Sequence, residues 1–136
     1  MLLTFLRLKN GQPDFHQVQV QMKYLILVKS SPSKKSNHSF LLNLLRCIET
    51  SKDQIQGVFF TGKAAEIAGS MNNGDAALLK KEFVALNEEF KIKLFVCGYA
   101  FRQIWKNVEA VDSHFVISGN MELSVLAIDS DRLMEF

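Results

Sequence analysis

The sequence predicts an α/β protein with three layers, α/β/α, around a mostly parallel sheet of five strands. Two observations lead to this fold class. Short strand-like runs alternate with segments whose apolar residues have helical spacing, and the strand-like runs are continuously apolar, as in strands buried on both faces. This alternation is typical of a parallel sheet covered by helices on both faces, with flavodoxin-like layering.

Composition is consistent with one such domain. The 136 residues are 48% hydrophobic and 22% charged, which is the profile of a globular chain with a single core. The formal net charge of +2 is too small to indicate nucleic acid or an acidic membrane surface as a partner. No apolar run approaches the roughly 20 residues that span a bilayer, and "MLLTFL" is too short for a signal-peptide core. We expect a cytoplasmic protein that contacts neither membrane nor nucleic acid directly.

The first part of the domain supplies two strands and one helix. "KYLILV" (23–28) predicts a strand, and the serine- and lysine-rich stretch 29–37 is typical of a loop. Apolar residues spaced by three and four predict a helix over 38–50. "IQGVFF" (55–60) then predicts a second strand.

The second part continues the alternation. A long connection over 61–75 has room for a short helix, and "AALLKKEFVALNEEF" (76–90) carries a helical stripe of Leu79, Phe83, Leu86 and Phe90. The candidates for N-caps of the two long helices are Ser36 or Asn37 and Asp75. The remaining elements are a strand at 92–97, a helix at 98–108, a strand at 114–119, a short helix at 120–128 and a final strand at 131–136.

Residues 1–21 fit this alternation less well. They contain "LLTFLRL", a turn-like "NGQPD" and the alternating "FHQVQVQ". These features predict either an additional hairpin or an N-terminal extension ahead of an α/β domain at 22–136.

Cys97 is the clearest candidate for a reactive residue because of its position. It ends the strand-like run 92–97, and a helix begins directly after it. Right-handed crossovers place every strand-to-helix junction at one edge of a parallel sheet, where ligands and chemistry gather. Backbone N–H groups and the helix dipole at such a junction favour thiolate, the nucleophilic form of cysteine. Gly98 leaves room beside the sulfur, and Arg102 either returns toward the turn or faces solvent.

The alternative for Cys97 is a buried packing role, since cysteine is among the most buried residue types. Cys47 lies within a helical segment beside Leu44 and Ile48, and we expect it to pack in the core. Two cysteines make no disulfide framework, and both should be thiols in a reducing compartment. The three histidines are scattered without metal-ligand spacing and are expected in loops or on the surface; they are His16, His38 and His114.

The surroundings of Cys97 disfavour other chemistries. Four residues separate Cys97 from Arg102, whereas the arginine of a cysteine-phosphatase loop would stand at Gln103, and no acidic residue follows closely. "TGKAAEIAGS" (61–70) lacks the glycine spacing of a P-loop. Phosphate-ester hydrolysis is therefore disfavoured, and a flavodoxin-like nucleotide or flavin site finds no glycine-rich turn to support it.

Several segments together resemble the DsrE/DsrF-like family of small sulfur-relay proteins, and the resemblance extends from about Met22 to Phe136. Two departures stand out. The stretch between Cys97 and Phe115 is short, and one arginine follows the cysteine where relatives have two. The segments that carry the resemblance are "GVFF" (57–60), "FVALN" (83–87), "KLFVC" (93–97), "FVISG" (115–119) and "DSDRLMEF" (129–136), the last with the most specific pattern, DR-x-x-x-F.

The resemblance implies a role for Cys97. In this family the cysteine after the third strand carries a persulfide, and the match assigns that role to Cys97. The protein is then expected to be a sulfurtransferase, or sulfur carrier, that needs no metal or organic cofactor. It would take sulfur from a donor protein and pass it to an acceptor protein, in tRNA 2-thiouridine synthesis or in sulfur oxidation. Candidates for supporting or partner contacts are Gly98, Tyr99, Arg102, Lys34 and Lys35.

The family also implies an assembly. Its members form trimers or hexamers, so we expect a homo-oligomer or a hetero-oligomer with homologous subunits of the DsrE, DsrF, DsrH, TusB or TusC type. An alternative function is a non-catalytic scaffold or regulatory subunit of a sulfur-relay complex, in which Cys97 is inert. The lysines of the 29–37 loop either dock an acidic partner or are simply solvated. Tyr99 and Trp105 are either interface aromatics or core residues.

Overall fold

A computed structural model of the chain describes residues 21–136 with their side chains, and residues 2–9 and 12–19 as backbone strands. The two N-terminal strands, β1 (Leu2–Lys9) and β2 (Gln12–Gln19), pair antiparallel in a two-stranded sheet of their own. The side chain of His16 lies outside the described residues. The division of the chain into residues 1–21 and 22–136 stays a prediction.

The rest of the chain forms the predicted three-layer α/β/α architecture, which confirms the fold class. Five parallel strands lie in the order β6-β5-β4-β3-β7. They are β3 (Lys23–Val28), β4 (Gln54–Phe60), β5 (Leu94–Cys97), β6 (Phe115–Ser118) and β7 (Arg132–Glu135).

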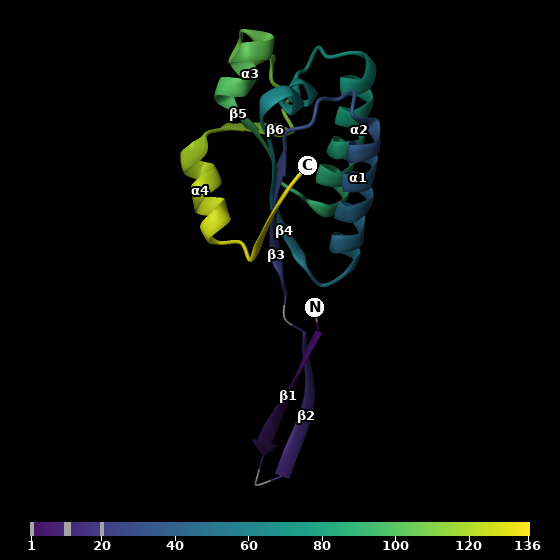
Figure 1. Ribbon diagram of the computed structural model, residues 1–136, viewed down its shortest axis with the longest axis vertical. Coiled ribbons are helices and arrows are strands. Elements are labelled where there is room, and N and C mark those ends of the chain that lie inside the picture. Colours follow the sequence, from purple (N-terminus) through teal and green to yellow (C-terminus); the bar gives the residue numbers. More distant parts are fainter. Residues whose placement is uncertain (1, 10–11, 20) are drawn as a thin grey trace.

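Helices cover both faces of this sheet (Figure 1). One face carries α1 (Lys35–Thr50) and α2 (Gly74–Phe90), and the other carries α3 (Gly98–Trp105) and α4 (Asn120–Ile128). Two short 3₁₀ helices, η1 (Gly62–Ala68) and η2 (Val108–Ala110), lie within the connections after β4 and after α3. Every predicted strand and helix is present, and η1 occupies the connection expected to hold a short helix.

The main core lies between the sheet and the pair α1 and α2. Phe60 of β4 is completely buried there, and its ring makes edge contacts with Phe83 at 5.0 Å and with Phe115 at 5.4 Å between centroids. Such aromatic pairs contribute about 0.5–1.5 kcal/mol beyond the area they bury. The predicted stripe of α2 faces this core, with Phe83 and Leu86 fully buried and Leu79 and Phe90 at its margin.

The expected packing role of Cys47 is wrong. Its side chain is exposed. The helix α1 buries residues spaced by three and four, and this stripe leaves Cys47 on the outer side although Ile48 beside it is buried. The stripe consists of His38, Leu41, Leu42, Leu45 and Ile48.

The expectation that His38 lies on the surface or in a loop is also wrong. It is a helical residue and almost completely buried, and its ring packs edge-on against Phe83 at 6.3 Å. Its Nε2 lies 3.2 Å from the carbonyl oxygen of Ser30 and 3.0 Å from that of Ser31. Carbonyl oxygens only accept hydrogen bonds, so Nε2 carries the proton and donates it. His38 therefore fixes the loop after β3 onto α1.

The predicted N-caps are not used. The residue that precedes α1 is Lys34, the residue that precedes α2 is Asn73, and neither makes a side-chain capping bond. Asp75 lies in the first turn of α2, where its carboxylate pairs with Lys35 at 3.2 Å. A carboxylate in the first turn interacts favourably with the helix dipole and stabilises the helix even without a capping bond.

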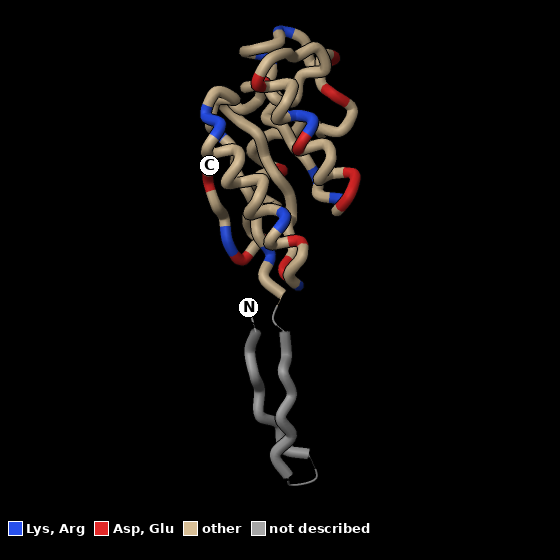
Figure 2. Tube along the Cα trace, turned by 90° about the vertical axis from the view of Figure 1, so that its right-hand side faces the viewer, with Lys and Arg blue, Asp and Glu red and all other residues tan. Residues whose placement is uncertain are grey.

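Acidic and basic residues are intermixed around the domain (Figure 2). Ion pairs join elements that are distant in sequence, such as Lys29 with Glu135 at 3.3 Å. Among the described residues, no helix has the length and apolar character that crossing a membrane requires.

Candidate functional site

Cys97 lies at the carboxyl end of β5 and directly precedes α3. β5 is an inner strand, between β4 and β6, and Cys97 is in register with Ser118 of β6. The Cys97 side chain is partly exposed. The first N–H groups of α3 have no partner within the helix, so they present partial positive charge at this junction.

An open cleft of about 430 Å³ lies beside Cys97. One wall comes from the start of α3, and the other from the chain that leaves β4 and enters η1. Two neighbouring strands of the sheet thus contribute their carboxyl ends to the same cleft, as expected for a parallel sheet. The lining residues are Thr61, Gly62, Lys63, Cys97, Tyr99, Ala100, Gln103 and Ile104.

Gly98 is a packing residue at the start of α3. It is buried, and a Cβ added to it would lie 3.1 Å from the side chain of Ile117 and 3.7 Å from the carbonyl oxygen of Ser118. The absence of a side chain thus allows α3 to begin close against β6. The same Cβ position lies 3.4 Å from Nη1 of Arg102, so the arginine returns toward the helix start. Within residues 21–136, Arg102 makes no ion pair.

Trp105 at the end of α3 holds this helix against η1. Its indole ring stacks near Phe101 at 6.3 Å and covers Gly69, where an added Cβ would lie only 2.3 Å from the ring. Its Nε1 is buried without a hydrogen-bond partner among the described residues. Trp105 is therefore a packing residue, whereas Tyr99 on the first turn of α3 is 70% exposed.

The lysines of the 29–37 loop do not line the cleft. Lys35 pairs with Asp75 of α2, and Lys29 pairs with Glu135 of β7. Lys34 is exposed and precedes α1. The positive charge of this loop is thus largely compensated within the domain.

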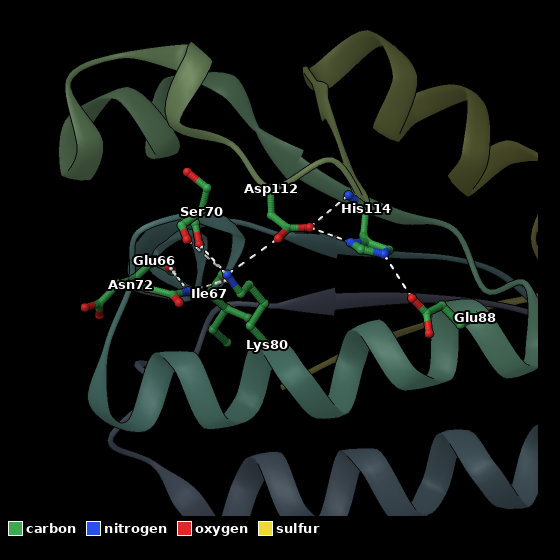
Figure 3. A network of polar contacts seen from close by, with 9 residues as sticks. Glu66, Ile67, Ser70, Asn72, Lys80, Glu88, Asp112 and His114 are labelled. Carbon is green, nitrogen blue, oxygen red and sulfur yellow. Dashed lines mark hydrogen bonds and ion pairs between the residues drawn. The ribbon is translucent and has the colours of Figure 1, made fainter.

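The sequence did not predict a second polar cluster, which joins α2 to the segment before β6 (Figure 3). The Lys80 ammonium donates to the carbonyl oxygen of Gly69 at 3.0 Å and lies 3.5 Å from a carboxylate oxygen of Asp112. The other Asp112 oxygen accepts from the backbone N–H of His114 at 2.9 Å and contacts its Nδ1 at 2.7 Å. Nε2 of His114 lies 3.1 Å from Glu88. We call the four side chains of Lys80, Glu88, Asp112 and His114 the Asp112 network.

The ionisation of this network follows from its contacts. The hydrogen bond with Asp112 is the main cause of a raised pKa of His114, and burial opposes it. Burial has the largest single effect on Asp112 and pushes its pKa upward, but the hydrogen bonds from His114 and the charge of Lys80 together hold that pKa below its ordinary value. The Asp-x-His spacing was the only local signal, since the other partners come from distant helix positions. No cluster suited to a metal ion occurs among the residues that the structure describes.

Solved structures show the same fold at low sequence identity. The ychN protein from E. coli matches with a TM-score of 0.67 and 13% identity, over 85% of this chain and 100% of that one. MTH1491 from Methanobacterium thermoautotrophicum, a protein of unknown function, matches with a TM-score of 0.63 and 9% identity, over 84% of this chain and 99% of that one. No curated protein matches the sequence.

A family model described as DsrE/DsrF-like matches residues 22–136. This range contains the whole five-stranded sheet, its four covering helices and the Cys97 junction. The match extends over far more than half of the chain, and the architecture agrees with it. The chain therefore belongs to the DsrE/DsrF-like family.

Proposed function

We propose that the protein is a sulfurtransferase that carries sulfur as a persulfide on Cys97. The observation that supports this most is the position of the thiol, which is partly exposed at the start of α3 and lines an open cleft. Family membership supplies the sulfur-relay context. The exposed Cys47 on α1 lines neither this cleft nor a helix start, and the proposal gives it no role.

The proposed transfer proceeds in two balanced steps. In the first, the Cys97 thiolate attacks the outer sulfur of a donor persulfide, R–S–SH. The new S–S bond on Cys97 forms as the donor S–S bond breaks, and the donor leaves as R–S⁻. In the second, an acceptor thiolate attacks the outer sulfur on Cys97, which leaves as a thiolate. Each step exchanges one S–S bond for another without net oxidation or reduction, so neither step requires a redox cofactor.

The residues around Cys97 have roles in these steps that follow from their placement. Cys97 is a thiolate both when it attacks the donor persulfide and when it is released by the acceptor, and the N-terminus of α3 favours negative charge at that point. The guanidinium of Arg102 lies near the same helix turn and adds positive charge. Ala100 and Ile104 give the cleft an apolar wall, which limits the access of water to the persulfide.

The proposal extends to a pathway and to partners. The motif segments resemble those of TusD, so we propose that the protein works in a sulfur relay toward tRNA 2-thiouridine, with sulfur oxidation as the other context. We further propose assembly with homologous subunits or with a second copy. An apolar row on α4 supports this assembly, because exposed apolar side chains grouped on one face of a helix are candidates for a contact site; the row consists of Met121, Val125 and Ile128.

Persulfide loading tests the central proposal. The protein is incubated with a small-molecule persulfide, and the modified residue is mapped by mass spectrometry. We expect one added sulfur on Cys97 in the wild type and in Cys47→Ser, and much slower uptake, on Cys47 alone, in Cys97→Ser. Uptake that Cys97→Ser leaves unchanged in rate would refute the role of Cys97 and favour the alternative of a scaffold with an inert cysteine.

A further inference from the structure

The cleft beside Cys97 has several apolar lining residues. Ala100 is buried, whereas the side chains of Ile104 and Tyr99 are exposed. A volume of about 430 Å³ falls in the range of roughly 300–1,000 Å³ typical of pockets for small organic groups. A bare sulfur atom uses little of this apolar surface, so the cleft is larger than the transferred atom requires.

The lining of the cleft carries one positive charge without an acidic partner among the described residues. Lys63 lines the cleft and makes no ion pair within residues 21–136, and none of the described lining residues is acidic. Five of the described lysines and arginines pair with carboxylates, whereas Lys63 has no such partner in this part of the chain and is free to meet a carboxylate from another molecule. The paired ones are Lys23, Lys29, Lys35, Arg46 and Lys80.

From these features we infer that the cleft selects its sulfur partner by peptide sequence. This inference rests on the proposed function and deepens it. The partner segment carries an apolar side chain next to its sulfur-bearing cysteine, and an acidic side chain that reaches Lys63. Burial of the apolar side chain against Ala100 and Ile104 supplies affinity, and the opposite charges supply orientation and a faster encounter.

The Lys63 contact replaces the sequence-based idea that the lysines of the 29–37 loop dock an acidic partner. Lys29 and Lys35 already have carboxylate partners within the domain, so using them would require breaking those pairs. Lys63 requires no such exchange and lines the same cleft as the sulfur of Cys97.

Disulfide exchange with defined peptides tests this inference. The probes are four tetrapeptides activated as 2-pyridyl disulfides, namely Glu-Leu-Cys-Gly, Lys-Leu-Cys-Gly, Gln-Leu-Cys-Gly and Glu-Gly-Cys-Gly. The Cys97 thiolate attacks the peptide sulfur, a new S–S bond forms, and the old one breaks. The leaving pyridine-2-thiolate takes a proton from solvent and absorbs light as the thione, which reports the rate. All rates are measured in a Cys47→Ser background and divided by the rate with 2,2′-dipyridyl disulfide.

The expected rates follow from charge and apolar contact. The Glu-Leu peptide should react about fivefold faster than the Lys-Leu peptide at low salt, with the Gln-Leu peptide between them, and the difference should shrink at high salt. It should react about threefold faster than the Glu-Gly peptide, because the leucine side chain is partly buried in the cleft.

Four variants assign these preferences to the cleft. Lys63→Glu should reverse the order of the Glu-Leu and Lys-Leu peptides, whereas Lys81→Glu on α2, a matched change outside the cleft, should leave the order unchanged. Ile104→Ser should remove the preference for leucine over glycine. Cys97→Ser is the one variant made in the chain that keeps Cys47; its remaining thiol is exposed, lies outside the cleft and should react with all four peptides at similar normalised rates.

The outcomes separate this inference from the proposed function. Equal normalised rates for all four peptides at Cys97, together with rapid reaction with 2,2′-dipyridyl disulfide, would overturn the selection by sequence and leave the sulfurtransferase proposal intact. A Cys97 that reacts with none of the reagents would overturn both. A preference that survives Lys63→Glu would also overturn the inference, since the charge would then act elsewhere.

Discussion

The cleft beside Cys97 and the Asp112 network both involve the connections that flank β4, β5 and β6. They differ in whether their charged side chains have partners within the domain. In the network, each side chain has a partner, as Lys80 has in Gly69 and Asp112. Lys63 in the cleft lining and Arg102 near the start of α3 are exposed and have no ion pair within the described residues. Satisfied buried polar groups stabilise a fold, whereas exposed positive charges without a partner beside a thiol are available to an anionic partner.

Gly69 is the point where the two regions meet, and its substitution should have the largest effect on stability. Its carbonyl oxygen accepts from Lys80, and its Cα faces the indole of Trp105. An alanine would place Cβ 2.3 Å from that ring, and such overpacking costs about 1–3 kcal/mol. Urea unfolding of Gly69→Ala should show this loss, and persulfide loading of Cys97 should slow because α3 shifts.

The control for this prediction is Gly119→Ala. A Cβ at Gly119 meets only an ordinary contact, 3.5 Å from the carboxylate of Glu122. Its unfolding free energy should stay within about 0.5 kcal/mol of the wild type. A Gly69→Ala protein as stable as Gly119→Ala would show that the indole moves away at little cost and does not hold α3 in place.

The next largest effect should come from Lys80→Ala, which separates stability from chemistry. In the wild type, the Lys80 ammonium contacts both Asp112 and the carbonyl oxygen of Gly69, and the change removes it from both. The unfolding free energy should fall by about 1–3 kcal/mol. Lys81→Ala, at an exposed neighbouring position, should change it by less than about 0.5 kcal/mol. Loading of Cys97 should be the same in both variants at temperatures where both are folded. A specific loss of loading in Lys80→Ala would contradict the division into two regions.

How far the sequence predicted these regions depends on the range of the interactions. Strands, helices and the junction at Cys97 followed from local apolar spacing and from the rules of parallel sheets. The wall formed by Thr61 and Lys63 was not predicted, because the connection after β4 has no apolar period to place it. The Asp112 network was missed because it joins residues such as Glu88 and His114, which are 26 positions apart.

The two wrong expectations have local causes. Cys47 was assigned to the core because its neighbour Ile48 is apolar, but one residue along a helix turns the side chain by about 100°, away from the buried stripe. His38 was expected in a loop or on the surface because the three histidines are scattered and show no metal-ligand spacing. The carbonyl oxygens of Ser30 and Ser31, which satisfy its Nε2, come from the folded path of the loop and not from the sequence pattern.

The smallest predicted effect is the pH dependence of stability that comes from the contacts of His114 with Asp112 and Glu88. Because the pKa of His114 is raised in the folded protein, its contribution to stability is fully present below the unfolded value of about 6.5 and is lost as pH rises through the folded value. The unfolding free energy of the wild type should therefore exceed that of His114→Asn by more at pH 5.5 than at pH 9, with a difference below about 1 kcal/mol because the site is partly exposed.

The same reasoning with the opposite sign applies to Asp112. Its pKa is lowered in the folded protein, so its contribution is present above its ordinary value and is lost as pH falls through the folded value. The prediction for His114 fails if the unfolding free energies of His114→Asn and the wild type have the same pH dependence between pH 5.5 and 9. The imidazole would then contribute no ionic link between Asp112 and Glu88.

The most direct test of the account compares the two cysteines of the native protein. Cys47 is the more exposed, whereas Cys97 lies at the start of α3 beside the cleft. If the helix start activates the sulfur, brief treatment with iodoacetamide near neutral pH should alkylate Cys97 about tenfold faster than Cys47, as measured by peptide mass spectrometry. Equal labelling, or faster labelling of Cys47, would mean that exposure alone sets reactivity and would contradict the persulfide role of Cys97.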